Sequence, residues 1–124
     1  MKQLTITLLM LLASLAAFAK SEIAPLLQAF DGRYNNSKGV EITMVEQSNN
    51  YYNSIEVKNN QAVTEQIVKW FNEVRAKAHS VSTSISDGEQ DIILNLENHV
   101  NVGLTTNSDK GKLDLWIHSP QPLK

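Results

Sequence analysis

Cysteine is absent from the 124 residues of the chain, and no internal repeat or low-complexity tract interrupts it. Without cysteine there are no disulfide bonds, so the stability of the folded protein must come from packing alone. The same absence excludes a cysteine nucleophile and a lipid attached to an N-terminal cysteine. Because no linker-like segment divides a chain of this length, we expect one folded domain.

A dominant charge of either sign is also lacking. Lysine and arginine number 11 against 13 acidic residues, which gives a formal net charge of −2, and the charges form no runs. A nucleic acid or an anionic membrane requires a basic patch on its partner, so we expect neither. The sequence has no G-x-S-x-G, H-E-x-x-H or glycine-rich phosphate-binding motif. We therefore predict a protein that is not an enzyme and that needs no cofactor and no metal ion.

The single long hydrophobic run lies at the N-terminus. Lys2 precedes an apolar stretch over residues 4–16, and Ala17-Phe18-Ala19 has the A-x-A pattern that signal peptidase recognises. The run is shorter than the roughly 20 apolar residues that span a bilayer. Residues 1–19 are therefore predicted to be a cleaved signal peptide. Residues 20–124 are predicted to form one periplasmic or secreted domain without a membrane span.

Two helices are predicted from apolar residues spaced three and four positions apart. The first has Ile23, Leu26 and Phe30 on one stripe, with Pro25 in its first turn. The second covers residues 61–78 and begins after Asn60, a residue that caps helices. Its apolar stripe consists of Val63, Ile67, Trp70, Phe71, Val74 and Ala78. Each helix therefore has one apolar face that must be buried.

Six strands are predicted from alternating apolar and polar residues between turn signals. The first two cover residues 39–47 and 51–58, and a turn at Asn49-Asn50 would place Met44 opposite Ile55. The last four cover residues 81–86, 91–97, 100–106 and 112–118.

Turns at Asp87-Gly88, at residues 97–99 and at Ser108-Asp109 set the register of these last four strands. They place Val81 opposite Leu94, Leu94 opposite Val102, and Val102 opposite Leu115, so that one apolar face is continuous.

The predicted fold is α+β, with the order α-β-β-α-β-β-β-β along the chain. Both helices are expected on one face of a mainly antiparallel six-stranded sheet, and the other face is expected to be open to water. The tail, residues 119–124, is expected to fray because its prolines end the last strand.

This pattern resembles small exported proteins of unknown function, common in Gram-negative gut anaerobes, that consist of a signal peptide and one helix-and-sheet domain. The resemblance rests on the short helix ending at Phe30-Asp31-Gly32, the hairpin over residues 40–57, the helix around residues 67–74 and the terminal meander. It implies residence in the periplasm or at the cell surface. It transfers no functional residue to this chain.

The derived register places a polar and aromatic cluster on the open face. Trp116 is expected opposite Asn101, His99 opposite His118, and Asp114 opposite Gly103. A large aromatic ring among amide, carboxylate and imidazole groups is typical of a stacking platform for a sugar, a peptide or a partner protein. Two histidines alone do not make a zinc site, which usually takes three or four ligands.

We therefore expect an exported, non-catalytic binding module that recognises a protein, peptide or glycan of the cell envelope. Its predicted binding residues are Trp116, Asn101, His99, His118 and Asp114. Two alternatives stay open. The first is a structural or assembly protein that forms a homodimer through the same face. The second is a small metal-dependent envelope enzyme that uses the two histidines.

Overall fold

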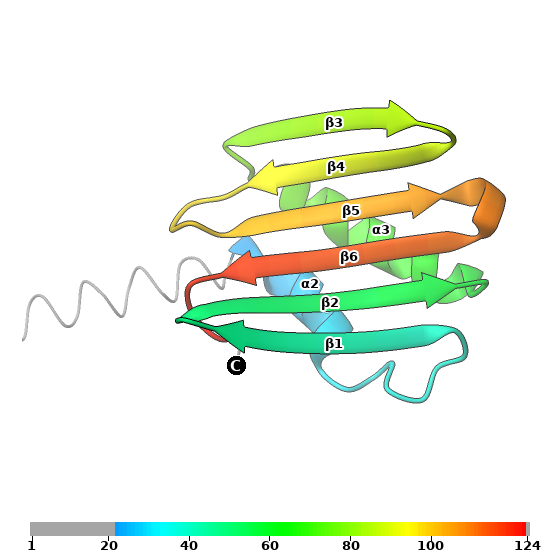
Figure 1. Cartoon of the computed structure of the whole chain (residues 1–124), viewed down its shortest axis with the longest axis horizontal. Coiled ribbons are helices and arrows are strands. Elements are labelled where there is room, and N and C mark those ends of the chain that lie inside the picture. The colour runs from blue at the N-terminus through cyan, green and yellow to red at the C-terminus, as the bar shows by residue number, and fades with distance from the viewer. Residues whose placement is uncertain (1–21, 124) are drawn as a thin grey trace, which may run out of the picture.

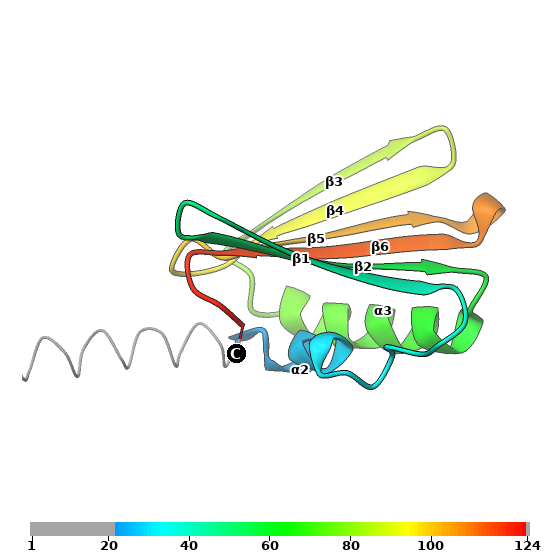
Figure 2. The ribbon, with the colours of Figure 1, turned by 60° about the horizontal axis from the view of Figure 1, so that its bottom comes forward.

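The computed structural model describes residues 22–123 and has the predicted α+β architecture in two layers (Figures 1 and 2). Six strands form one antiparallel sheet, and the helices lie together on one of its faces. The predicted signal peptide lies outside the described residues. Within residues 22–123, none of the helices combines the length and the apolar character needed to cross a membrane.

The helical layer contains a short and a long segment. The helix α2 (Ala24–Leu27) continues into the 3-10 turn η1 (Gln28–Phe30), which confirms the first predicted helix. The helix α3 (Gln61–Arg75) begins where predicted, because the Asn60 side chain accepts a hydrogen bond from the Val63 N–H at 3.3 Å. It ends three residues before the predicted boundary, since the chain tightens into i to i+3 hydrogen bonds over residues 74–78.

The strands follow the predicted order along the chain, whereas their order across the sheet is not sequential. They are β1 (Val40–Gln47), β2 (Asn50–Lys58), β3 (Ser80–Ser86), β4 (Glu89–Asn95), β5 (Asn101–Asn107) and β6 (Lys112–Ser119). Across the sheet the order is β1-β2-β6-β5-β4-β3 (Figure 1). The last strand of the meander, β6, thus pairs with β2 of the first hairpin, and β1 and β3 are left as the two edges.

The register of the first hairpin differs from the predicted one by two residues. The turn lies at Ser48-Asn49, one position earlier than predicted, and both residues have positive φ, at 50° and 64°. As a result Met44 pairs with Asn53, and Ile55 pairs with Ile42. Because a shift by two residues preserves the faces of a strand, the apolar side of the hairpin still points toward the helices.

The registers of β3 with β4 and of β4 with β5 are as predicted, whereas that of β5 with β6 is wrong. The loop before β6 contains a 3-10 turn, η2 (Ser108–Lys110), followed by Gly111 at φ 59°, so it is two residues longer than the two-residue turn expected. The pairing therefore slides by two residues, and Val102 meets Ile117 in place of Leu115. Again the apolar face is preserved.

The core lies between the sheet and the helices. Its centre is formed by α3 residues and by the inward residues of β2, β4, β5 and β6. The most deeply buried large side chains include Phe71, Ile67, Ile55, Leu94, Leu113, Leu115 and Ile117.

Of the tail that is predicted to fray, residues 119–124, the structure describes residues 119–123. Ser119 belongs to β6 and is buried, and its hydroxyl donates a 2.6 Å hydrogen bond to the carbonyl oxygen of Gln121. Leu123 packs against the core.

Candidate functional site

The sheet face away from the helices is uncovered in the part of the chain that the structure describes (Figure 2). Its residues form rows that run across the strands. One row contains Thr43, Ser54, Trp116, Gly103 and Ile93, in that spatial order. Trp116 lies on β6, near the centre of the sheet, where a ligand could contact residues of the strands on both sides.

The indole ring of Trp116 lies directly over Gly103. A Cβ atom at position 103 would overlap the ring atoms of Trp116, so glycine is the residue that lets the ring settle against the backbone of β5. Among residues 22–123 the indole N–H has no hydrogen-bond partner, and the side chain stays partly exposed. The ring is thus fixed by the sheet below it while its N–H group is free for a ligand.

His118 and Tyr52 extend this platform toward β1. Their rings stack with centroids 4.5 Å apart and an angle of 22° between planes. The His118 Nε2 atom lies 3.1 Å from the Asn50 Oδ1 atom, so the neutral tautomer with a proton on Nε2 would donate a hydrogen bond there. The stack holds the imidazole in one orientation on the open face.

His99 does not join the cluster, and the predicted pairing with His118 is wrong. His99 lies with Asn98 in the β4–β5 loop, where both residues have positive φ, and its side chain is exposed. His118 is opposite Asn101 instead, because the longer loop before β6 moves the whole strand by two positions. The predicted pairing of Trp116 with Asn101 is wrong for the same reason.

Asp114 belongs to an ion-pair group one row away from Trp116. It pairs in register with Thr105 rather than Gly103, and its carboxylate lies 3.7 Å from the Lys112 Nζ atom. Lys112 also lies 3.9 Å from Glu56, which in turn pairs with Lys58 at 3.2 Å. Burial raises the pKa of Asp114, nearby Glu56 raises it further, and Lys112 opposes both. The carboxylate is therefore engaged by protein cations.

The described residues, 22–123, contain no set of side chains that could ligate the metal ion of the alternative metal-dependent enzyme. Within that range no three histidine, aspartate or glutamate side chains are grouped so as to hold a metal ion. The two histidines proposed for such a site lie in different places, one in a loop and one in a stacked pair. The open face presents aromatic and hydrogen-bonding groups around Trp116 and an ion-pair group around Asp114.

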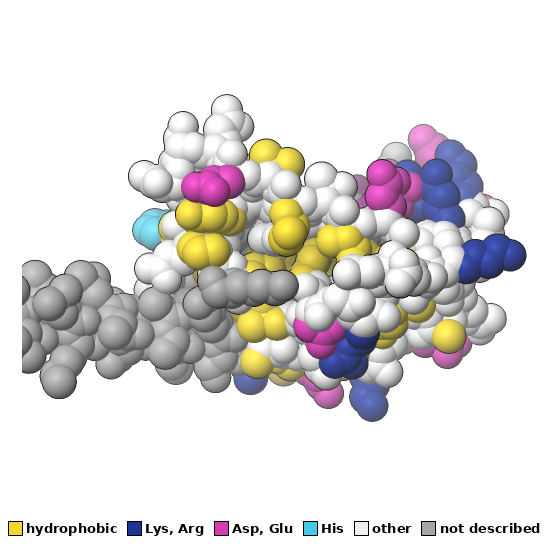
Figure 3. Space-filling view, turned by 90° about the horizontal axis from the view of Figure 1, so that it is seen from below, with side chains coloured by type: hydrophobic (Ala, Val, Ile, Leu, Met, Phe, Trp, Pro, Cys, Tyr) yellow, Lys and Arg dark blue, Asp and Glu magenta, His cyan; other side chains and the backbone are white. Residues whose placement is uncertain are grey.

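Sequence reasoning missed a pocket on the other side of the sheet. It has a volume of about 460 Å³ and lies between the α2–η1 segment, the β1–β2 hairpin and the C-terminal tail. Viewed from the β1 edge (Figure 3), apolar side chains gather between the sheet and the helical layer. The signal was present in the sequence: Asn53 occupies an inward position of β2, where every neighbouring strand places an apolar residue.

Comparisons with protein-family models, with curated proteins and with solved structures give no match. The functional argument therefore rests on the sequence and on the geometry of the sites.

Proposed function

We propose that this protein is an exported, non-catalytic binding module whose ligand lies against the open sheet face. The observation that carries the proposal is the position of Trp116, with its indole seated over Gly103 near the centre of an uncovered face. A single exposed aromatic ring is common on protein surfaces, but this one has a backbone shaped to receive it. Its free N–H group adds a directional contact.

The surroundings of Trp116 favour a protein or peptide ligand. Val45, Tyr52 and Ile93 are large hydrophobic residues on the same face, exposed at 49%, 46% and 39%. Polar residues such as Ser54, Asn95 and Asn101 lie between and around them. Aromatic and aliphatic centres with a polar rim are typical of protein interfaces, and a Trp or Tyr anchor contributes most of their binding energy.

The test is the capture of partners from the cell envelope by immobilised wild-type protein and by the Trp116→Ala variant. The control is Ile85→Ala, which removes an apolar side chain that is more exposed than Trp116 from the helix-side face of β3. We expect Trp116→Ala to lose the captured partner by about tenfold or more while the control retains it. Equal capture by all three proteins contradicts the proposal, and capture of polysaccharide alone identifies a glycan as the ligand.

The same variant tests the homodimer that the face would form in place of a foreign interface. Burial of Trp116 against a second copy would shift tryptophan emission to shorter wavelength as the protein concentration rises. We expect no concentration dependence of the emission, because the proposed ligand of this face is a different molecule and not a second copy of the chain. A concentration-dependent blue shift that is absent in Trp116→Ala would contradict the binding module and would support an assembly protein that dimerises through this face.

A further inference from the structure

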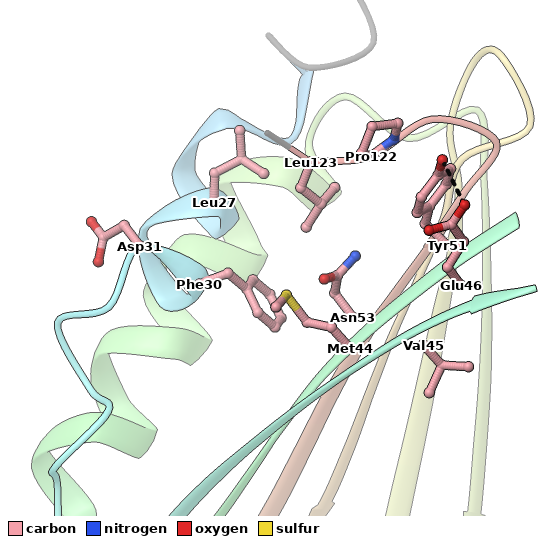
Figure 4. A pocket seen from close by; sticks show the side chains of 10 residues that line it. All are labelled: Leu27, Phe30, Asp31, Met44, Val45, Glu46, Tyr51, Asn53, Pro122 and Leu123. Atoms are coloured by element: carbon pink, nitrogen blue, oxygen red, sulfur yellow. Dashed lines mark hydrogen bonds between the residues drawn. The ribbon is translucent and has the colours of Figure 1, made fainter. Parts of the chain in front are cut away.

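We propose that the pocket between the helical layer and the β1–β2 hairpin binds a small, neutral, mainly apolar ligand that carries one hydrogen-bonding group. Leu27 and Phe30 form its helical wall, Met44 its sheet wall, and Leu123 the wall from the tail (Figure 4). Its volume of about 460 Å³ lies in the range of pockets that bind small molecules. This site is separate from the open face and does not depend on the proposed function.

Asn53 supplies the polar contact that a ligand would need. The side chain is only 6% exposed, and its amide has no hydrogen-bond partner within residues 22–123. Figure 4 shows the amide pointing into the space between Phe30, Met44 and Leu123. Because the amide lines the pocket, it can donate to and accept from a molecule bound there, as the few polar groups of apolar ligand pockets do.

The mouth of the pocket determines the charge of the ligand. Glu46 lies at the rim, and its carboxylate accepts a 3.3 Å hydrogen bond from the Tyr51 hydroxyl. Partial burial and the carboxylate together raise the pKa of Tyr51, so the hydroxyl stays protonated. Asp31, also at the rim, pairs with Arg33 at 2.8 Å, and that contact holds the pKa of Asp31 low. Because Arg33 offsets the charge of Asp31, the acidic side chain of Glu46 is the group at the opening that disfavours an anionic ligand.

Three fluorescent probes separate these features of the site. N-phenyl-1-naphthylamine is neutral and has one N–H donor for the Asn53 oxygen, pyrene is neutral with no hydrogen-bonding group, and anilinonaphthalene sulfonate is an anion. We expect the wild-type protein to bind the amine with micromolar affinity and the sulfonate at least about tenfold more weakly. Asn53→Leu should lower the affinity for the amine about three- to tenfold and should leave the affinity for pyrene unchanged or higher.

Two further variants locate the probe. Leu27→Trp fills the pocket from the helical wall and should abolish binding of the amine, as should Met44→Trp at the more exposed sheet wall. Thr43→Trp is the matched control, because it adds the same ring to the open side of the same strand. Circular dichroism establishes that each variant is folded.

The proposal is overturned by any of three results. The first is the absence of probe binding to the folded wild-type protein. The second is equal affinity for the anionic and the neutral probe, which would indicate non-specific adsorption to apolar surface. The third is loss of binding in Trp116→Ala with retention in Leu27→Trp and Met44→Trp, which would place the probe on the open face.

A different observation carries a second inference, at the β3 edge of the sheet. All seven residues of β3 are exposed, and the strand contains no charged residue and no proline. The opposite edge strand, β1, carries Glu41 and Glu46. Edge strands usually carry charges or prolines that prevent pairing with other chains, so β1 is protected and β3 is not.

The sequence of β3 is symmetric about its central residue except that Val81 corresponds to Ile85. It is Ser-Val-Ser-Thr-Ser-Ile-Ser, with Thr83 in the middle. A two-residue hairpin closes on a hydrogen-bonded pair, here Ser86 and Glu89, and bonded positions alternate along the strand. The backbone groups of Val81, Thr83 and Ile85 therefore point away from β4 and toward the free edge.

We infer that two copies of the chain pair through β3 in antiparallel fashion, with the two-fold axis at Thr83. This register places Val81 against Ile85 of the partner copy, and serine against serine, so that both faces match. It also covers Ile85, which is 73% exposed in the single chain. Since one strand pair is a small interface, the association should be weak and dependent on concentration.

The absence of native cysteine allows a direct test by cross-linking. Thr83→Cys places the two thiols opposite each other across the axis, at a Cα separation of about 5.5 Å that suits a disulfide bond. Ser82→Cys is the matched control, since its two copies would be diagonal neighbours at roughly 7 to 8 Å, which is too far. Thr43→Cys on the β1 edge reports random collision.

Under mild oxidation we expect dimers of Thr83→Cys to form at least about tenfold faster than those of either control, because pairing raises the effective thiol concentration. Light scattering of the cysteine-free protein should show the same association, and Thr83→Lys should abolish it by placing like charges at the axis. Equal rates for positions 83 and 43 contradict the inference. Faster cross-linking at position 82 contradicts the register.

Discussion

At the residue scale, the contact between Gly103 and Trp116 governs the geometry of the proposed binding face. We expect Gly103→Ala to push the indole off the sheet, because the new methyl group would occupy the space of the ring. The loss should be about 1 to 3 kcal/mol of unfolding free energy, as for other overpacked sites. Urea unfolding and tryptophan emission measure the two effects. Ser54→Ala, on the strand beside Trp116, should change neither.

Asp114 shows how burial opposes charge on the same face. Because burial raises its pKa in the folded protein, this group favours folding when protonated and disfavours it as the pH rises through the raised pKa. Asp114→Asn should therefore stabilise the protein at pH 7, by less than about 1 kcal/mol since the carboxylate stays partly in water and pairs with Lys112. Denaturant unfolding at pH 3 should show no difference. A destabilised variant at pH 7 would mean that the pair with Lys112 dominates.

The sequence identified Trp116 as an open-face residue, and only its neighbours were wrong. Alternation along β6 assigns the face of Trp116 whatever the loop length, whereas the residue opposite it depends on that length. His99 lies in the turn at residues 97–99, as predicted, at positive φ, and only its pairing with His118 was wrong. Asn53 was missed because alternation identifies the inward apolar residues of β2 but not the role of the one polar residue among them.

At the element scale, Asn60 connects α3 to the segment before β1 through two hydrogen bonds. Its Oδ1 atom accepts from the Val63 N–H, and its Nδ2 atom donates to the Lys38 carbonyl oxygen at 2.8 Å. Asn60→Ala should cost about 1 to 2 kcal/mol of unfolding free energy. Asn60→Asp keeps the helix cap but loses the donor to Lys38, so it should fall between alanine and wild type. If both variants are equally unstable in urea, the bond to Lys38 rather than the cap is decisive.

Helix and strand positions followed from periodicity, and the two errors of register both arose at loops. A sequence shows where a hairpin turns only when one pair of residues adopts positive φ more readily than the residues beside it. Asp87-Gly88 is such a pair, and the turn predicted there is confirmed, since only glycine and a few polar residues adopt positive φ readily. In the first hairpin, by contrast, Ser48-Asn49 and Asn49-Asn50 were equally suitable pairs for the turn. In the β5–β6 loop, the 3-10 turn added two residues that the pattern did not indicate.

At the scale of the whole molecule, the two-layer α+β class followed from the sequence while the order of strands in space did not. Two helices with one apolar stripe each and a sheet with one apolar face allow few other packings. The insertion of β6 beside β2 depends on contacts between segments far apart in the chain, such as Ile55 with Leu115. Apolar alternation is the same for any pair of such strands, so it cannot select the partner.

Export is the prediction that concerns the full chain, and it rests on residues 1–19 alone. Expression of the complete sequence in a bacterium with a periplasm should yield a protein that begins at Lys20, as shown by the intact mass of the envelope fraction. Replacing Ala17 and Ala19 together with bulky residues should leave the longer precursor on the membrane, because signal peptidase requires small side chains at both positions. A protein that keeps Met1 and stays in the cytosol would contradict export, and with it the envelope partner sought for Trp116.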